Sequence, residues 1–376
     1  MNKKLTYIIG SLTLLSALFA CNKKGTSSIS TPSKDSSSSS NDVASSTTSS
    51  STSSTPIVTY DKVTFGTYPQ SKVTDSTLIS SLTSQAGSLP SNGSNQNWTS
   101  YKYYYGVEQT SSRDNLASNK NDFMWYQDVT YNNNSYRGVY FTSYRPDTCT
   151  RLPEEVNTKQ KDNGYLINTV YWFKFEDISW RVLSETSDDK FLWTDKILDA
   201  QTYYHDNHNN TTATRAPYDS TTTAAVYDNN YKYSDIRGWL NEDFYSLAFT
   251  SEINTKIKTS TVTNTITGNT YACENTEDKV FILSNDELKD TSYKFTSDGT
   301  AIDNARETTS TDYAKCMGLY VDKSKDNQSY YLTRTPRSTS GAQIEIVGPY
   351  GEGGGKYNVT ARYADMGIRP AIHISK

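Results

Sequence analysis

The sequence is poor in the residues that build metal and redox sites. It has four cysteines and three histidines in 376 residues, with no C-x-x-C pair, which argues against a redox motif or a structural zinc site. Neither G-x-S-x-G nor H-E-x-x-H occurs, so no motif supports nucleophilic or zinc-dependent hydrolysis. His205 and His208 lie close to Asp206 in an Asn-rich segment, which is better interpreted as a solvated loop than as a metal site. We predict no metal and no cofactor.

The chain also lacks an excess of positive charge. It carries 37 basic and 41 acidic residues, for a net charge of −4, and no basic stripe, which argues against a nucleic-acid partner. Its length is sufficient for one large core or two small ones. Thirty tyrosines fit two interpretations equally well, a polar β protein decorated with aromatic rings and a bias in coding composition.

The one long apolar run is at the N-terminus. Lys3 and Lys4 form a basic region, and Leu5–Ala20 is apolar but short for a membrane span, which needs about 20 apolar residues. The run ends in Leu-Phe-Ala-Cys, which resembles the lipobox of bacterial lipoproteins, where the thiol carries the lipid. We therefore predict a signal peptide over residues 1–21, lipidation of Cys21, and a lipid anchor in the outer face of a bacterial cell membrane.

The segment that follows is almost purely Ser and Thr. Residues 22–56 contain too few apolar side chains to offset the entropy of ordering, so we predict a disordered tether. A flexible chain of this length spans roughly 30 Å. The globular part is expected over residues 57–376, with residues 71–168 as an insertion that elaborates a single domain.

The strongest helical pattern lies in Tyr233–Lys258, and the rest of the domain is expected to fold over it. Ser234 is a suitable N-cap because its hydroxyl can accept from a free N–H of the first turn. Thr250 can cap a second short helix that carries Ile253 and Ile257. Apolar side chains recur at three- and four-residue steps and so share one face, namely Ile236, Trp239, Leu240, Phe244, Leu247 and Ala248.

Other segments predict one more helix and a series of strands. Asp75–Gly87 reads as a helix capped at Asp75 or Ser76 and ended by Gly87. Phe123–Tyr144 reads as a hairpin around Asn132-Asn133-Asn134, because asparagine tolerates the positive φ of tight turns. Further strands are predicted over Ile57–Tyr68, Trp98–Tyr105, Thr169–Phe175, Ile178–Ser184, Phe191–Thr194, Lys279–Ser284, Tyr330–Thr333, Gln343–Val347 and Gly367–Ile374.

Several of these motifs together resemble a family of bacterial surface proteins, domain of unknown function 6273. The stretch SDIRGWLNEDFYSLAF is similar to the family pattern W-x-x-S-x-I-R-x-W-L-N-x-x-F-x-x-x-A-F without its leading Trp. From Val63 to Ile374 the pieces VTFGTYPQ, ISWRVL, KVFILSNDEL, YYLTRTPRS and GIRPAIHI follow in the expected order. The family has no established activity. Structural roles are expected for Trp180, Arg237, Trp239, Leu240, Phe244 and Arg369.

The element order predicts an α+β fold, a mixed-sheet domain with a central pair of short helices. The closing GIRPAIHI looks like the C-type-lectin-like fold, including its formylglycine-generating-enzyme branch, in which the first and last strands pair. That analogy would place Val58–Phe65 beside Ile368–Ile374 and carries no function by itself. We expect Arg369 to meet a buried carboxylate. A disulfide between Cys273 and Cys316 is the expected pairing, because both lie in the half that resembles the family.

Candidate ligand contacts lie near the C-terminal strands. The Gly-rich stretch Gly348–Lys356 fails the Walker pattern and is interpreted as a flexible loop, a place where ligands usually bind. Arg334 and Arg337 approach this loop and could grip an anionic or sugar ligand, although structural roles are favoured for these arginines. The expected ligand contacts are Arg334, Arg337, Tyr350, Glu352 and Lys356.

The sequence indicates a lipid-anchored surface protein whose head binds an extracellular ligand, carbohydrate or protein, without turnover. The first alternative is a secreted hydrolase on the same scaffold, which needs a pocket with convergent carboxylates or a Cys–His pair. The second alternative is a structural component of the cell envelope.

Overall fold

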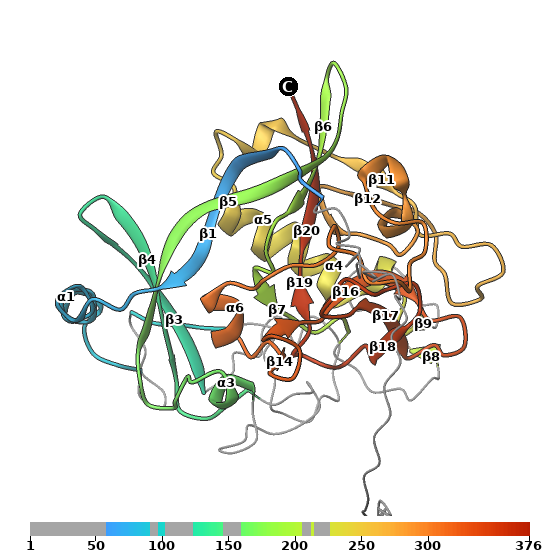
Figure 1. Cartoon of the computed structure of the whole chain (residues 1–376). Coiled ribbons are helices and arrows are strands. Elements are labelled where there is room, and N and C mark those ends of the chain that lie inside the picture. The colour runs from blue at the N-terminus through green and yellow to red at the C-terminus, as the bar shows by residue number, and fades with distance from the viewer. Residues whose placement is uncertain (1–57, 91–96, 102–122, 146–158, 205–211, 214–225) are drawn as a thin grey trace, which may run out of the picture. The chain divides into compact units, whose positions relative to one another are not determined.

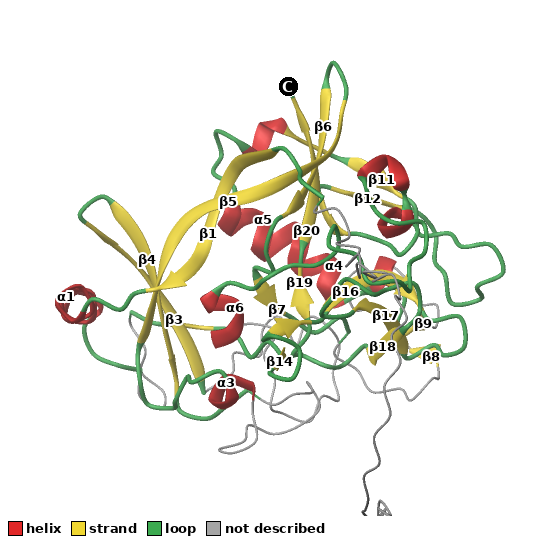
Figure 2. Cartoon of the chain, in the orientation of Figure 1, coloured by secondary structure: helices red, strands yellow, loops and turns green. Residues whose placement is uncertain are grey.

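The described part of the chain is built around one long strand. The computed structural model describes residues 58–90, 97–101, 123–145, 159–204, 212–213 and 226–376, which belong to a unit running from Thr55 to Lys376. Mostly antiparallel sheets carry a few short helices, which confirms the predicted α+β class (Figures 1 and 2). The expected signal peptide, Cys21, the tether and His205–His208 lie outside the described residues.

Strand β5 (Tyr171–Glu185) has partners along both edges. On one edge, its residues Phe173–Arg181 pair with β1 (Lys62–Lys72) from one end of β1 to the other. On the other edge, its first half pairs with β4 (Asn134–Phe141) and its second half with β6 (Asp189–Thr194). The two strands predicted over residues 169–184 are therefore one, and the β1–β5 pair crosses from one half of the sheet to the other (Figure 1).

The two halves of this sheet continue differently. Beyond β4 come β3 (Met124–Tyr131) and β2 (Thr99–Ser100). Beyond β6 comes β20 (Pro370–Ser375). The far edge of β20 is shared by β10 (Ile257–Lys258) and β13 (Val280–Ile282).

The expected pairing of the first and last strands is wrong. Strand β1 pairs with β5, while both edges of β20 are taken by β6, β10 and β13. The backbone groups of β20 are therefore already satisfied by strands that come later in the chain than β1.

A second sheet has five strands in the order β18–β17–β16–β19–β7. The chain passes directly from one sheet to the other between β6 and β7, and again between β19 and β20. Arg369 lies at the second crossing, is 1% exposed, and donates to the carbonyl oxygens of Thr194 and Arg306. Its guanidinium stacks 3.2 Å from the centre of the Trp193 ring. The strands of this sheet are β7 (Asp199–Ala200), β16 (Tyr331–Pro336), β17 (Gln343–Val347), β18 (Tyr357–Thr360) and β19 (Gly367–Ile368).

We expected Arg369 to meet a buried carboxylate, but among the described residues no carboxylate forms an ion pair with it. The nearby carboxylate of Asp195 instead accepts from Lys62 and Arg181, each at 2.7 Å. Backbone carbonyls freed at the crossing between sheets need donors, and Arg369 supplies them.

The predicted central helix is confirmed over its first part. α4 (Asp235–Trp239), the π-helical turn η2 (Leu240–Phe244) and α5 (Tyr245–Ala248) follow one another, and the Ser234 side chain accepts from the Arg237 N–H as the cap. The predicted second helix is only the single turn η3 (Asn254–Lys256). Ile257 leaves it to pair with Ile374 as part of β10, because the free edge of β20 offers a strand partner.

The region of the predicted insertion forms a small core of its own. Helix α1 (Ser76–Ala86) begins at the Asp75 cap and ends at Gly87 as predicted. It packs on one face of the β3–β4 hairpin, whose turn has positive φ at Asn132 and Asn133. Because side chains alternate along a strand, one face of the hairpin meets α1 while the other faces the rest of the domain. The core under α1 comprises Val73, Leu82, Ala86, Trp98, Trp125, Val129, Tyr136, Tyr140 and Trp172.

The expected disulfide is absent. Cys273 and Cys316 are free thiols, and burial raises the pKa of both. Cys316 is fully buried in α6 (Asp312–Cys316), whereas Cys273 is half-buried beside the backbone of Tyr231 and Lys232. The two thiols therefore lie in different surroundings and are not bonded to each other. In the described part of the chain no helix has the length and apolarity to cross a membrane.

Gly66 allows β1 to lie against the central helix. It has a φ of +74° at a bulge in β1, and an added Cβ would lie 2.6 Å from the Ala248 carbonyl oxygen and 2.7 Å from the Phe249 ring. Gly268 has a similar φ of +78° with open space around it. A substitution at Gly268 therefore tests backbone strain alone, whereas a substitution at Gly66 tests strain and close packing together.

Gly66→Ala should lower the free energy of unfolding by roughly 2–5 kcal/mol, because positive φ strain and overpacking add. Gly268→Ala should cost about 1–2 kcal/mol, from strain alone. Chemical denaturation of both variants measures the difference. Equal losses would show that the contact of β1 with Ala248 and Phe249 is not tight.

Candidate functional site

The residues expected to bind a ligand do not converge on one site. Arg334 is 3% exposed, and its guanidinium donates to both carboxylate oxygens of Glu287, at 2.6 and 2.8 Å, and to the Ile282 carbonyl. Arg337 lies elsewhere, beside Thr339, at the edge of a shallow polar hollow. Arg334 is thus occupied by a buried ion pair, and buried arginines need such a partner.

The other three expected residues hold the Gly-rich loop in place. Glu352 is buried and accepts from the Lys356 ammonium at 3.1 Å and from the Tyr350 N–H at 3.2 Å. The Tyr350 hydroxyl donates to Asp326. These contacts pair the charged groups of the loop with each other, so the loop does not present them to a ligand.

A different cavity combines aromatic rings with carboxylates. It has a volume of about 340 Å³, within the range of roughly 300–1,000 Å³ found for small-ligand sites. We call it the Asp199 cavity. It is lined by Tyr68, Thr99, Ser100, Tyr101, Tyr126, Asp128, Arg137, Asp199, Trp239, Asp243, Phe244, Ser246, Leu247 and Tyr313.

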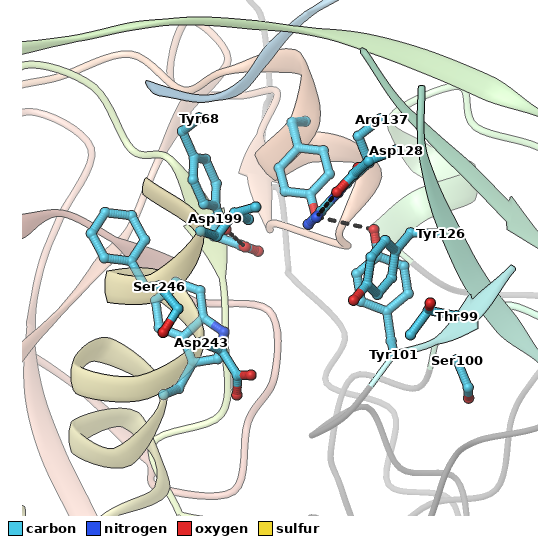
Figure 3. Close-up of a pocket in the computed structure, with 14 residues that line it drawn as sticks. Tyr68, Thr99, Ser100, Tyr101, Tyr126, Asp128, Arg137, Asp199, Asp243 and Ser246 are labelled. Atoms are coloured by element: carbon cyan, nitrogen blue, oxygen red, sulfur yellow. Dashed lines mark hydrogen bonds and ion pairs between the residues drawn. The ribbon is translucent and has the colours of Figure 1, made fainter. Parts of the chain in front are cut away.

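The cavity lies between two walls that come from different parts of the chain. In Figure 3, Asp243 and Ser246 lie on the helical segment of η2 and α5, opposite Tyr126, Asp128 and the residues of β2. The helical wall places its apolar face in the core and leaves Ser246 exposed at the rim. The amphipathic pattern of this segment therefore buries Trp239 and Phe244 and presents polar atoms to the cavity.

Tyr68 and Asp199 form the buried end of the cavity. The Tyr68 hydroxyl donates to Asp199 Oδ2 at 2.6 Å, and the Ala200 N–H donates to Asp199 Oδ1 at 2.7 Å. The Tyr68 ring contacts Phe244 and meets Tyr313 edge-on, with centroids 5.2 and 5.6 Å away. Tyr68 comes from β1 and Asp199 from β7, so this bond joins the two sheets.

Burial raises the pKa of Asp199 to about 6, although the hydrogen bonds from Tyr68 and Ala200 and the charges of Arg145 and Arg137 act in the opposite direction. Strongly perturbed carboxyl groups in a cavity are candidates for function, because enzymes and receptors use such groups as proton donors or acceptors.

Arg137 and Asp128 form an ion pair at the hairpin wall. Nε and Nη2 of Arg137 each donate to one oxygen of Asp128 at 2.7 Å. The guanidinium lies over the Tyr126 ring, 4.2 Å from its centre. Burial alone would lower the pKa of Arg137, but the bonds to Asp128 outweigh it and the pKa is raised. A flat, fixed guanidinium of this kind orients neighbouring polar groups well.

Tyr101 links the hairpin wall to α6. Its hydroxyl lies 3.0 Å from the hydroxyl of Tyr313, and its ring packs 4.9 Å from that of Tyr126. The lining residues carry three carboxyl groups and one guanidinium. The cavity is therefore suited to neutral or cationic groups and unsuited to anions.

The signals for this site were partly present in the sequence. The predicted hairpin put Asp128 and Arg137 on neighbouring strands, but only the two-residue turn at Asn132 and Asn133 sets the register that brings them opposite each other. Trp239 and Phe244 were predicted as structural and line the cavity as well. Nothing local indicates that Tyr68 meets Asp199, because 131 positions separate them.

The described residues contain no group of three or more His, Cys, Asp or Glu side chains placed to hold a metal ion. The geometry defines a mixed-sheet domain with an aromatic, carboxylate-bearing cavity between its hairpin and its central helix. The family whose model matches, over residues 187–376, is described as a domain of unknown function, DUF6273. The chain belongs to this family.

The matched half contributes Asp199, Trp239, Asp243 and Tyr313 to the cavity. The hairpin wall, Tyr68 and the motifs VTFGTYPQ and ISWRVL precede the matched residues. Comparisons with curated proteins and with solved structures gave no match.

The buried Asp199 carboxyl should give stability a characteristic pH dependence. Its folded pKa of about 6 exceeds the ordinary value of 3.8, so the folded state keeps the proton that the unfolded state loses. Relative to Asp199→Asn, the wild type should therefore lose stability as the pH rises from about 4 to 7. The full change is about 3 kcal/mol, from a shift of about two pKa units.

Urea denaturation at several pH values measures this difference. Asp195→Asn is the matched control, for which the expected change of stability with pH has the opposite sign. The bonds from Lys62 and Arg181 outweigh burial and lower the pKa of Asp195, so the wild type loses its advantage over that variant as the pH falls. A flat difference for Asp199→Asn would show that the carboxyl is solvated.

Proposed function

We propose that this chain is a surface-anchored lipoprotein whose head binds a sugar unit of an extracellular glycan in the Asp199 cavity. The observation that carries the proposal is that aromatic rings and carboxylates line the same small cavity. Sugars have apolar C–H faces, which pack on aromatic rings, and the half-buried Tyr126 ring lines this cavity. Their hydroxyls donate to carboxylates in charge-assisted hydrogen bonds.

Size and charge favour this ligand over the other class expected from the sequence. A cavity of about 340 Å³ suits one small unit, whereas a protein partner is usually held by a broad surface. The excess of carboxylates disfavours anionic sugars.

The surface location is supported by the N-terminal sequence. Lys3 and Lys4, the apolar Leu5–Ala20 and the following Cys21 have the arrangement of a lipoprotein signal peptide. The Ser/Thr-rich residues 22–56 have the composition of a flexible tether. Such a tether would let the head reach glycans beyond the membrane surface.

Filling the cavity from its rim should weaken binding without disturbing the core. Ser246 is exposed on α5, so Ser246→Trp places an indole in the cavity. On an array of neutral, amino and acidic sugars, wild type should bind neutral or amino sugars, and the variant should bind at least tenfold more weakly. The control Glu252→Trp adds the same bulk at an exposed position outside the cavity and should bind normally.

Loss of binding in both variants, or binding confined to acidic sugars, would contradict the sugar site. Thermal melting of each variant shows whether it is folded.

A hydrolase is a second candidate, favoured by the raised pKa of Asp199 beside two further carboxylates, Asp128 and Asp243. A protonated carboxyl can act as general acid and an ionised one as base or nucleophile in glycoside cleavage. The same array decides between the candidates. Shortening of a bound glycan near pH 6, lost in Asp199→Asn, would indicate hydrolysis, and an unchanged bound glycan supports a binding protein.

Lipid attachment should depend on one thiol. Cells that express wild type and are fed a radioactive fatty acid should yield labelled protein in the membrane fraction, because the thiol of Cys21 carries a diacylglyceryl group whose acyl chains hold the label. Cys21→Ala should remove the label and release the protein or leave it unprocessed. Cys149→Ala is the control and should keep the label. Labelling of Cys21→Ala would contradict the anchor.

A further inference from the structure

A second hollow adjoins the Asp199 cavity along the β3–β4 hairpin. We call it the hairpin groove. It has a volume of about 450 Å³ and shares two lining residues, Asp128 and Leu247, with the Asp199 cavity. Leu247 lies on α5 and Asp128 on β3, so both hollows lie between the same two walls.

The register of the hairpin shows that the two hollows follow one face. Tyr126, Asp128 and Thr130 alternate along β3 and therefore point to the same side of the sheet. Across the strands, Asp128 is opposite Arg137 and Thr130 is opposite Ser135. Tyr126 and Arg137 line the Asp199 cavity, whereas Thr130 and Ser135 line the hairpin groove. The face runs without interruption from one hollow to the other toward the turn.

The chemistry of the groove differs from that of the cavity. Hydroxyl and amide side chains such as Thr130, Ser135 and Asn134 dominate its lining, with the Phe175 ring as an apolar wall. Its one charged side chain, Asp128, is already paired with Arg137. Neutral donors and acceptors beside an aromatic ring suit the hydroxyls and C–H face of another sugar unit.

We propose that the hairpin groove is a second sugar subsite and that the ligand is a neutral oligosaccharide of at least two units. This inference rests on the proposed function, with the first unit in the Asp199 cavity and the next over Thr130 and Ser135. An extended peptide fits less well. Peptides that add as a strand need free backbone groups at a sheet edge, and the groove presents side chains on a sheet face.

The test compares sugar lengths on the full chain in detergent micelles. Homologous series of one to four units of glucose, N-acetylglucosamine, galactose and mannose serve as probes. For the series that binds, two or three units should bind at least tenfold more tightly than one. Ser135→Trp, which fills the groove from an exposed position, should reduce every member to the affinity of the single unit.

Ser84→Trp is the matched control, because Ser84 is exposed on α1 outside both hollows, and it should keep the dependence on length. Equal affinity for one unit and four, unchanged in Ser135→Trp, would overturn the second subsite and leave the first intact. Binding of no member by wild type would overturn the second subsite, and it would overturn the first as well if the array also showed no bound amino sugar. Tighter binding of a Ser/Thr-rich peptide than of any sugar would overturn both.

Discussion

The structure depends on the two-sided pairing of β5. One strand of 15 residues bonds to β1 along one edge and to β4 and β6 in succession along the other. The β3–β4 hairpin and the β6–β20 half of the sheet are therefore held by a single hydrogen-bonded strand pair. Trp180 marks the middle of this arrangement. It is fully buried, pairs with Val63 on one side and Thr194 on the other, and donates from its indole to the Phe65 carbonyl at 2.7 Å.

The irregular C-terminal half is held by buried arginines. Arg306 is fully buried and donates to the carbonyl oxygens of Leu288, Ala301 and Gly351, among others. Arg369 does the same where the chain changes sheets, and Arg334 joins β16 to Glu287. Loops buried in a domain must satisfy their backbone groups. An arginine side chain offers five N–H donors. It therefore takes the place of the backbone N–H groups that a neighbouring strand would supply.

The Asp199 cavity exists because these two halves meet. Its helical wall and Asp199 belong to the residues matched by the DUF6273 family, whereas Tyr68, Asp128 and Arg137 precede them. The matched residues thus supply the buried carboxyl, and the residues before them supply the ion pair and most of the lining of the adjoining groove. A change of the hairpin alters the second wall while β7 and α5 stay in place. Under the proposed function, selectivity for one ligand over another is therefore expected to depend on the hairpin more than on the matched half.

Elements whose causes are local could be predicted from the amino-acid order alone. The caps of α1 and α4, the asparagine turn of the hairpin and the apolar face that carries Trp239 and Phe244 follow from neighbours within a few residues. Long-range packing sets three contacts that no local pattern indicates: β1 pairs with β5 and not with β20, Arg334 meets Glu287, and Tyr68 reaches Asp199. Those contacts join residues tens to more than a hundred positions apart. Strands with similar apolar patterns compete for the same partner, and the choice depends on which arrangement satisfies every buried backbone and charged group at once.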